Sequence, residues 1–386
     1  MEKCNQNLKA AILEPWFLEA YPDRPVYTVI PERCKINKPV GLFIFMHGGD
    51  TDSPPDQPYK TYLNPEKGVL QPYISDIPFI TIAPAALTAV DGKRWNRCAV
   101  RQYVLALIEG ACKRFNIDRD RIILGGHSMG GFGAYHLAPL LADKLAGAWL
   151  SAGAWQEEDF RGCLGTPLYI MHGKWDCAYN YRGGHTDPRH HDWCGVSFAR
   201  GAHELMLEYD IDHVYDEHTG GHGLNWEPCQ LAFQRFLRWA ARQKRAPYAS
   251  RCAVVMPNGS KDPDLENIKA SRWLEITETI PGKVTLDKIV LTGPNLAWRA
   301  DELAMQSFYL RKSEHDGARL IGENLGGNNF EFTAENIKSF VCYLHPEMAD
   351  LSKELNFKVN GKPCKCKVSE VTSHPDYTAK AECHLD

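Results

Sequence analysis

The chain has 386 residues, a net charge of −4 and 44% hydrophobic residues, which is the composition of a globular protein long enough for two domains. Because there is no basic excess, the composition argues against nucleic acid or an anionic membrane surface as a partner. No apolar stretch approaches the roughly 20 residues of a membrane span, and the first residues lack the plan of a secretory signal. We therefore expect a cytoplasmic protein, or a secreted one if a leader was removed.

The region 1–245 alternates short apolar runs with helical periodicity. The apolar runs, which are typical of strands buried on both faces, lie at 40–46, 79–83, 122–124, 146–150 and 168–171. Apolar residues spaced as on a helix face lie at 99–115, 196–209 and 230–242. This alternation predicts a doubly wound, mostly parallel α/β sheet, with about 40 residues before its first strand.

The character of the sequence changes near residue 245. The region 246–386 carries short alternating or β-branched segments, and Asn360-Gly361 is a strong hairpin signal. We expect a small all-β domain here, sandwich-like in architecture. Its aromatic residues suit either a core or a carbohydrate-binding face, and we favour a structural or lid-like role; they are Trp273, Trp298, Phe308 and Tyr309.

The segment Gly126-His127-Ser128-Met129-Gly130 follows the apolar run 122–124 and precedes a helical stretch at 132–141. A serine at the apex of a strand, a tight turn and a helix is the G-x-S-x-G arrangement that exposes a nucleophilic hydroxyl. The two glycines are needed because side chains at those positions would collide with neighbouring backbone. Ser128 is the candidate nucleophile, although an ordinary glycine-rich turn would carry the same letters.

A serine hydroxyl needs a base, and the base needs an orienting carboxylate. Asp176 lies just after the strand-like run 168–171, where such an acid is expected, and its competitors are Asp187, Asp192, Asp210 and Asp212. His222 lies in a Gly-Gly-His-Gly loop before the last helix of the region and is the expected base. His218 is the main alternative.

An oxyanion hole requires two backbone N–H donors. We expect one from Met129, directly after the nucleophile, and the other from the loop His47-Gly48-Gly49-Asp50 after the run 40–46. Gly48, Gly49 and Asp50 all remain candidates for the second donor, and a plain Gly-Gly turn is the alternative interpretation.

Side chains that could contact a substrate cluster near the expected catalytic residues. Tyr, Trp, His and Arg are frequent in 179–193, and this segment suits a cleft-lining loop better than a metal site. The candidate substrate contacts are His127, Trp95, Trp175, Tyr179, His185 and Trp226, and Trp155 belongs to the same group of loop tryptophans. The thirteen cysteines include no Cys-x-x-Cys pair, and we expect thiols rather than disulfides.

With Gly126–Gly130, Asp176, His222 and His47-Gly48-Gly49 identified, the region 25–243 resembles the α/β-hydrolase superfamily. It is most similar to the esterases related to polyhydroxybutyrate depolymerases, feruloyl esterases and acetylxylan esterases, which are often described as prolyl-oligopeptidase-like. The C-terminal region is similar to a module found on some of these hydrolases. The resemblance implies hydrolysis of a carboxylic ester by two-step acyl transfer, without a metal or an organic cofactor. A prolyl-oligopeptidase-like peptidase and a non-catalytic binding protein are the alternatives.

Overall fold

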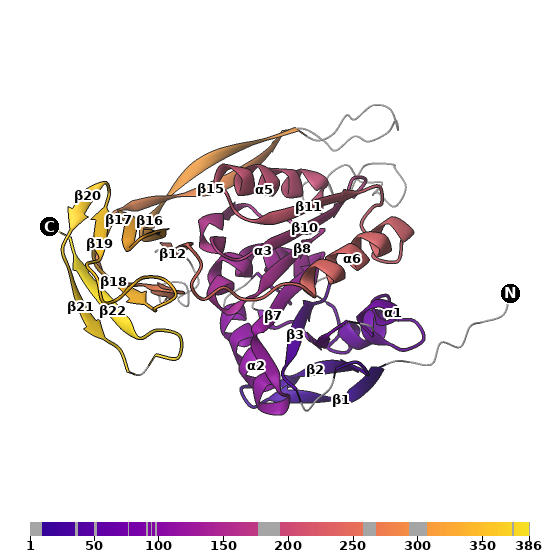
Figure 1. Cartoon of the computed structure of the whole chain (residues 1–386). Helices are drawn as coiled ribbons and strands as arrows, with labels where there is room; N and C mark the ends of the chain where they lie inside the picture. Colours follow the sequence, from indigo (N-terminus) through magenta and orange to yellow (C-terminus); the bar gives the residue numbers. More distant parts are fainter. Residues whose placement is uncertain are drawn as a thin grey trace.

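The computed structural model describes residues 10–34, 38–49, 52–75, 77–89, 92–93, 95–96, 99–176, 194–257, 268–292, 307–372 and 374–385. A central sheet with helices on both faces forms the larger part of the molecule, and a strand-rich part formed by the C-terminal residues packs beside it (Figure 1). Among the described residues, no helix combines the length and the apolar character that a membrane crossing requires.

The central sheet has eight strands, and parallel pairing dominates it. In spatial order they are β1 (Ala10–Leu18), β2 (Tyr21–Pro31), β4 (Phe79–Pro84), β3 (Val40–Met46), β7 (Ile117–His127), β8 (Gly147–Ser151), β10 (Leu168–Gly173) and β11 (His213–His218). The strand β2 runs antiparallel to β1 and β4, and all neighbours from β4 to β11 are parallel. The predicted doubly wound sheet is therefore confirmed.

The prediction that about 40 residues precede the first strand of the sheet was wrong. Two strands of the sheet, β1 and β2, precede Val40, where the sequence suggested that the first strand begins. β1 is an edge strand with mostly half-exposed side chains, so it lacks the continuous apolar run that marks the inner strands.

Helices cover the two faces of the sheet and create two cores. The helices are α1 (Gln71–Ile74), α2 (Val100–Arg114), α3 (Met129–Leu141), α5 (Val196–Glu208) and α6 (Glu227–Ala240), with short helical turns η1 (Pro58–Leu63), η2 (Ala142–Lys144) and η3 (Phe160–Cys163). The helices α2, α3 and α5 pack on one face, and α6, α1 and η1 on the other. Alternation along β3 serves both cores, because Ile44 faces the first core and Phe43 and Phe45 the second.

The C-terminal part consists of two further sheets around a third core. Its strands are β12 (Arg251–Pro257), β13 (Ala270–Ser271), β14 (Leu274–Thr279), β15 (Lys283–Thr292), β16 (Ser307–Gly326), β17 (Asn329–Glu335), β18 (Ile337–Leu344), β19 (Asn356–Val359), β20 (Lys362–Cys364), β21 (Cys366–Glu370) and β22 (Ala379–His384). Asn360 and Gly361 form the predicted two-residue hairpin, since both have positive φ and Val359 pairs with Lys362. Trp273 is fully buried in the third core, so this ring is no carbohydrate platform. Trp298 lies outside the described residues.

The two parts are joined by strand pairing and by buried polar contacts. The short strand β9 (Glu157–Glu158) pairs with β15 of the C-terminal part. The guanidinium of Arg272 donates to four backbone carbonyls: Ala142 at 3.1 Å, Leu164 at 3.2 Å, Gly165 at 2.8 Å and Ala246 at 3.1 Å. Three of these carbonyls, those of Ala142, Leu164 and Gly165, belong to the part of the chain that forms the central sheet, so the buried side chain fastens β13 and β14 to it. The predicted boundary between residues 245 and 246 lies in the segment between α6 and β12 and stays a prediction.

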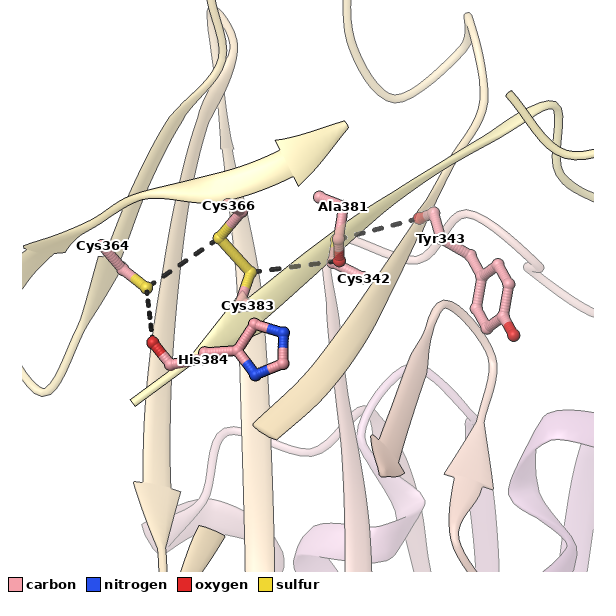
Figure 2. The surroundings of a disulfide bond; sticks show 7 residues. All are labelled: Cys342, Tyr343, Cys364, Cys366, Ala381, Cys383 and His384. Carbon is pink, nitrogen blue, oxygen red and sulfur yellow. Dashed lines mark hydrogen bonds between the residues drawn. A yellow bond between two sulfur atoms is a disulfide. The ribbon is translucent and has the colours of Figure 1, made fainter. Parts of the chain in front are cut away.

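One expectation about the cysteines was wrong. Cys366 and Cys383 form a disulfide between the neighbouring strands β21 and β22 (Figure 2). Cys364 lies beside it, with its Sγ 3.9 Å from that of Cys366. The sequence spacing could not reveal this bond, because the partner of Cys366 is brought beside it only by strand pairing.

Candidate functional site

Ser128 lies at a strained turn between β7 and α3. Its backbone has φ 59° and ψ −120°, a conformation that few non-glycine residues adopt and that is common where strain serves a function. A Cβ on Gly126 would lie 2.2 Å from the carbonyl oxygen of Gly130, and a Cβ on Gly130 would lie 1.9 Å from that of Met46. Both glycines are therefore required by backbone contacts, as the sequence pattern predicts.

The structure brings together the three residues that the sequence nominated. The Nε2 atom of His222 lies 2.8 Å from the Oγ atom of Ser128, and its Nδ1 atom lies 2.9 Å from both carboxylate oxygens of Asp176. Asp176 follows β10, and His222 lies in the loop between β11 and α6, so all three occupy the carboxyl end of the parallel strands. Ser128 and His222 are partly exposed, whereas Asp176 is fully buried.

The surroundings of Asp176 keep its carboxyl group ionised. Burial alone would raise its pKa, but the neighbouring His222 and a hydrogen bond from His172 outweigh burial and hold the pKa well below its ordinary value. The Nε2 atom of His172 lies 3.0 Å from the carboxylate. Because an ionised carboxylate only accepts hydrogen bonds, Nε2–H of His172 and Nδ1–H of His222 are the donors. The free lone pair of His222 therefore faces Ser128.

Two neighbours act on the imidazole of His222. Burial would lower the pKa of His222, but Asp176 and the Cys194 side chain, which hydrogen-bonds to the ring, raise it well above the ordinary value. The backbone of Cys194 is fixed as well, since its carbonyl oxygen lies 2.9 Å from Nε2 of His172. On the other side, the ring of His127 packs against that of His222 with 5.1 Å between centroids.

The oxyanion loop departs from expectation at Gly48. Its N–H already donates to the hydroxyl of Tyr62 at 3.1 Å, so of the two predicted glycines Gly49 is the better candidate for the second donor. Gly48 instead allows close approach, because a Cβ there would lie 3.0 Å from Cβ of Ser128. Met129 opens α3, and its N–H is one of the helix donors that lack a partner within the helix. Asp50 lies outside the described residues.

Of the predicted substrate contacts, Trp95, His127 and Trp175 are buried, and Trp226 is half-buried. Trp95 is fully buried, and its indole N–H donates to the carbonyl of His47 at 3.0 Å, so it supports the loop after β3 and offers no surface to a ligand. His127 is 5% exposed and lies 3.0 Å from Oγ of Ser151, which makes it a support beneath His222. Trp175 is also buried, at 8% exposure, and Trp226 is half-buried and stays a prediction.

Other predicted features cannot be placed. Tyr179 and His185, with the whole segment 177–193, lie outside the described residues.

Trp155 is 3% exposed and donates to the carbonyl of Phe198 at 2.8 Å, so it is a packing residue and not a cleft wall. The picture of four tryptophans around a cleft was therefore wrong for Trp95, Trp155 and Trp175.

Sequence reasoning missed three residues of the site: His172, Cys194 and Tyr62. The first had a usable signal, since it precedes Asp176 by four residues at the end of a buried strand. The other two are brought in by loops and by η1, and their spacing from Ser128 carries no comparable sign.

The arrangement has the parts that acyl transfer requires. A reachable hydroxyl contacts an imidazole whose lone pair can accept its proton, and a buried carboxylate orients that imidazole. Helix α3 begins at the serine, so its positive end points at the site where an oxyanion would form.

Comparisons with known proteins give one distant relative in sequence. No protein-family model matches the chain. The chain is 26% identical over 162 residues to a bifunctional acetylxylan esterase/xylanase of Neocallimastix patriciarum, a match that covers 41% of this chain and 22% of that protein. The chain thus spans about a fifth of the length of this relative.

Solved structures resemble the chain over similar portions. A thermostable esterase has a TM-score of 0.44 and 17% identity, over 61% of this chain and 64% of its own. A ferulic acid esterase of Anaeromyces mucronatus has a TM-score of 0.44 and 13% identity, over 62% and 94%. An S-formylglutathione hydrolase of Staphylococcus aureus has a TM-score of 0.44 and 15% identity, over 62% and 100%.

The chain's own topology settles the fold class. Six neighbouring strands are parallel, an antiparallel pair extends one edge, and a serine elbow connects β7 with α3. An acid and a histidine follow in that order after later strands of the sheet. This chain therefore has the α/β-hydrolase fold, with additional strand-rich sheets at its C-terminal end.

Proposed function

We propose that this chain is a serine hydrolase that cleaves a carboxylic ester. The observation that carries the proposal is the continuous contact from the Ser128 hydroxyl through His222 to Asp176, with distances of 2.8 and 2.9 Å. A hydroxyl held in this way can act as a nucleophile at neutral pH. Ser128 lies at the carboxyl end of the parallel strands, and open α/β sheets bind ligands at that end.

The reaction has two steps. In the first, Nε2 of His222 takes the proton of Ser128 as its Oγ attacks the ester carbonyl, and the backbone N–H groups of Met129 and Gly49 hold the oxyanion. His222 then protonates the departing alcohol, which leaves an acyl-serine. In the second step the same histidine takes a proton from water, which attacks the acyl group and releases the acid.

For the substrate class, we propose an acetyl, feruloyl or short hydroxyacyl ester, with a carbohydrate-linked alcohol as the leading candidate. The support is the 26% identity with the acetylxylan esterase/xylanase of Neocallimastix patriciarum, which covers 41% of this chain. No metal or organic cofactor enters this mechanism, because Ser128, His222 and Asp176 supply the nucleophile, the base and the orienting charge.

The first test is hydrolysis of p-nitrophenyl acetate and butyrate by the native chain and by Ser128→Ala. We expect the variant to lose about 10⁴-fold or more in kcat/KM, because the covalent step becomes impossible. Equal turnover by both proteins would refute Ser128 as the nucleophile. Intact-mass analysis after a fluorophosphonate should show one adduct on the native chain and none on the variant.

The second test sorts the acyl group and the alcohol. Methyl ferulate, acetylated xylan and hydroxybutyrate oligomers differ in these two parts and share the ester bond. Acid release from ferulate or acetylated xylan supports the proposed class. Release only from peptide substrates would replace it with the peptidase alternative.

A further inference from the structure

A thiol, an imidazole and a carboxylate converge at the site, and the mechanism above uses only two of them. One ligand-type atom each from Asp176, Cys194 and His222 lies within 4.8 Å of the other two. The thiol belongs to Cys194, which lies two residues before α5 and far from Ser128 in sequence. This thiol hydrogen-bonds to the ring of His222. Acyl transfer requires no sulfur at this position.

We propose that Asp176, Cys194 and His222 form an inhibitory site for a thiophilic divalent cation, of which Zn²⁺ is the natural example and Cd²⁺ a probe. Thiolate, imidazole and carboxylate are the three ligand types that Zn²⁺ prefers, and a site with three protein ligands leaves a fourth position for water. The inhibition rests on the proposed function, whereas the binding of the ion does not.

The geometry near the carboxylate suits an ion. Nδ1 of His222 already lies 2.9 Å from both oxygens of Asp176, so an ion that enters between them has to part these atoms only slightly. The Asp176 carboxylate is held by His172 at 3.0 Å, which is the kind of outer hydrogen bond that fixes metal-bound carboxylates. Ionised Asp176 and a Cys194 thiolate together balance the charge of a divalent ion.

The ion also has a way in. The side chain of His222 is 30% exposed, and Cys194 is half-buried, so two of the three ligands border solvent. Asp176 is fully buried and lies behind them. Hard ions such as Mg²⁺ prefer oxygen ligands and retain their water, so they are not expected to bind here.

Coordination would stop catalysis through the tautomer of His222. Nδ1 binds the ion through its lone pair, so the remaining ring proton must reside on Nε2. Nε2 would then donate to Ser128 and could no longer accept the hydroxyl proton. The serine remains in place but has lost its base.

The test begins with a direct measure of binding. Cd²⁺ bound to a thiolate gives an ultraviolet charge-transfer band, and we would titrate Cd²⁺ into the full chain, Ser128→Ala, Cys194→Ala and Cys112→Ser. Cys112 lies on α2 and serves as the matched thiol control. We expect the band in all proteins except Cys194→Ala. We also expect calorimetry with Zn²⁺ to show at least ~100-fold weaker binding for that variant, since even outer-sphere partners cost 10–100-fold.

The second measurement is inhibition. With p-nitrophenyl acetate, each protein's rate in Zn²⁺ is divided by its own rate in a chelator, and Mg²⁺ serves as the ion control. We expect Zn²⁺ to inhibit the native chain and Cys112→Ser reversibly, and to spare Cys194→Ala. Equal binding or equal inhibition with and without Cys194 would overturn the site. A Cys194-dependent band in a protein that cleaves no ester would support the site and count against the proposed function instead.

Discussion

Replacing Asp176 by asparagine tests the central contact of the site with almost no change in shape. The carboxylate accepts from Nδ1 of His222 at 2.9 Å and from Nε2 of His172 at 3.0 Å. An asparagine amide has one acceptor oxygen and one donor nitrogen, so it cannot accept from both rings in the same way. If its oxygen takes the position of Oδ2, which contacts both rings, its NH₂ group takes the position of Oδ1, 2.9 Å from Nδ1 of His222.

That orientation reverses the useful tautomer. Nδ1 of His222 must then accept, the ring proton moves to Nε2, and the base toward Ser128 is lost. In serine hydrolases, the equivalent change costs ~10⁴-fold in kcat, which corresponds to about 5 kcal/mol of transition-state stabilisation. KM should change little, because Asp176 is fully buried.

The assay is the steady-state hydrolysis of p-nitrophenyl acetate by Asp176→Asn beside Asp216→Asn. Asp216 on β11 is a matched control, since its carboxylate accepts from Arg235 on α6 and from Tyr169 on β10, and His222 is not among these partners. We expect the control to retain the native kcat. A kcat of Asp176→Asn within tenfold of native, in a protein with an unchanged melting temperature, would refute the role assigned to this carboxylate.

Three further predictions concern pH and stability. Activity should fall as the pH falls through the pKa of His222. Because Asp176 raises this pKa, the acid limb of the kcat/KM profile should lie above pH 6.5. An acid limb at pH 6.5 or lower would contradict the contact between His222 and Asp176. Burial lowers the pKa of His218 to about 4, so the fold keeps it neutral, and this contributes up to about 3 kcal/mol of stability above pH 6.5 that is lost as the pH falls toward 4. Urea titrations at several pH values should show a shallower loss for His218→Gln than for the native chain. Arg272→Met should lower the free energy of unfolding by about 3–5 kcal/mol, because the carbonyls that accept hydrogen bonds from Arg272 stay buried without a donor. The measurement is calorimetry. An unchanged melting temperature would show that water replaces the side chain.

The sequence was sufficient for the parts of the fold that have a strong local signal. The predicted strand at 40–46 coincides with β3, because a strand buried on both faces requires a continuous apolar run. The Asn360-Gly361 turn forms as expected, because positive φ at both positions favours these two residue types. The edge strand β1 leaves no such mark. The hydroxyl, imidazole and carboxylate could be nominated because each follows a strand at the same edge of the sheet.

What the sequence could not supply are contacts made by returning loops. The hydrogen bond from the N–H of Gly48 to Tyr62 makes Gly49 the better of the two glycine candidates for an oxyanion donor, and this bond depends on where η1 packs. The approach of Cys194 to His222 depends in the same way on how the chain re-enters α5. Trp95 was misjudged because a strand-end tryptophan looks the same in sequence whether it faces a ligand or the protein interior.

The reach of Arg272 into the hydrolase half has a practical consequence for anyone who wishes to shorten this protein. A chain cut after α6 would leave the carbonyls of Ala142, Leu164 and Gly165 facing solvent or one another, and it would lose the strand that pairs with β9. We expect such a fragment to be poorly soluble. The C-terminal strands are therefore better treated as a permanent part of this protein than as a removable accessory, and shorter versions should be sought by trimming loops.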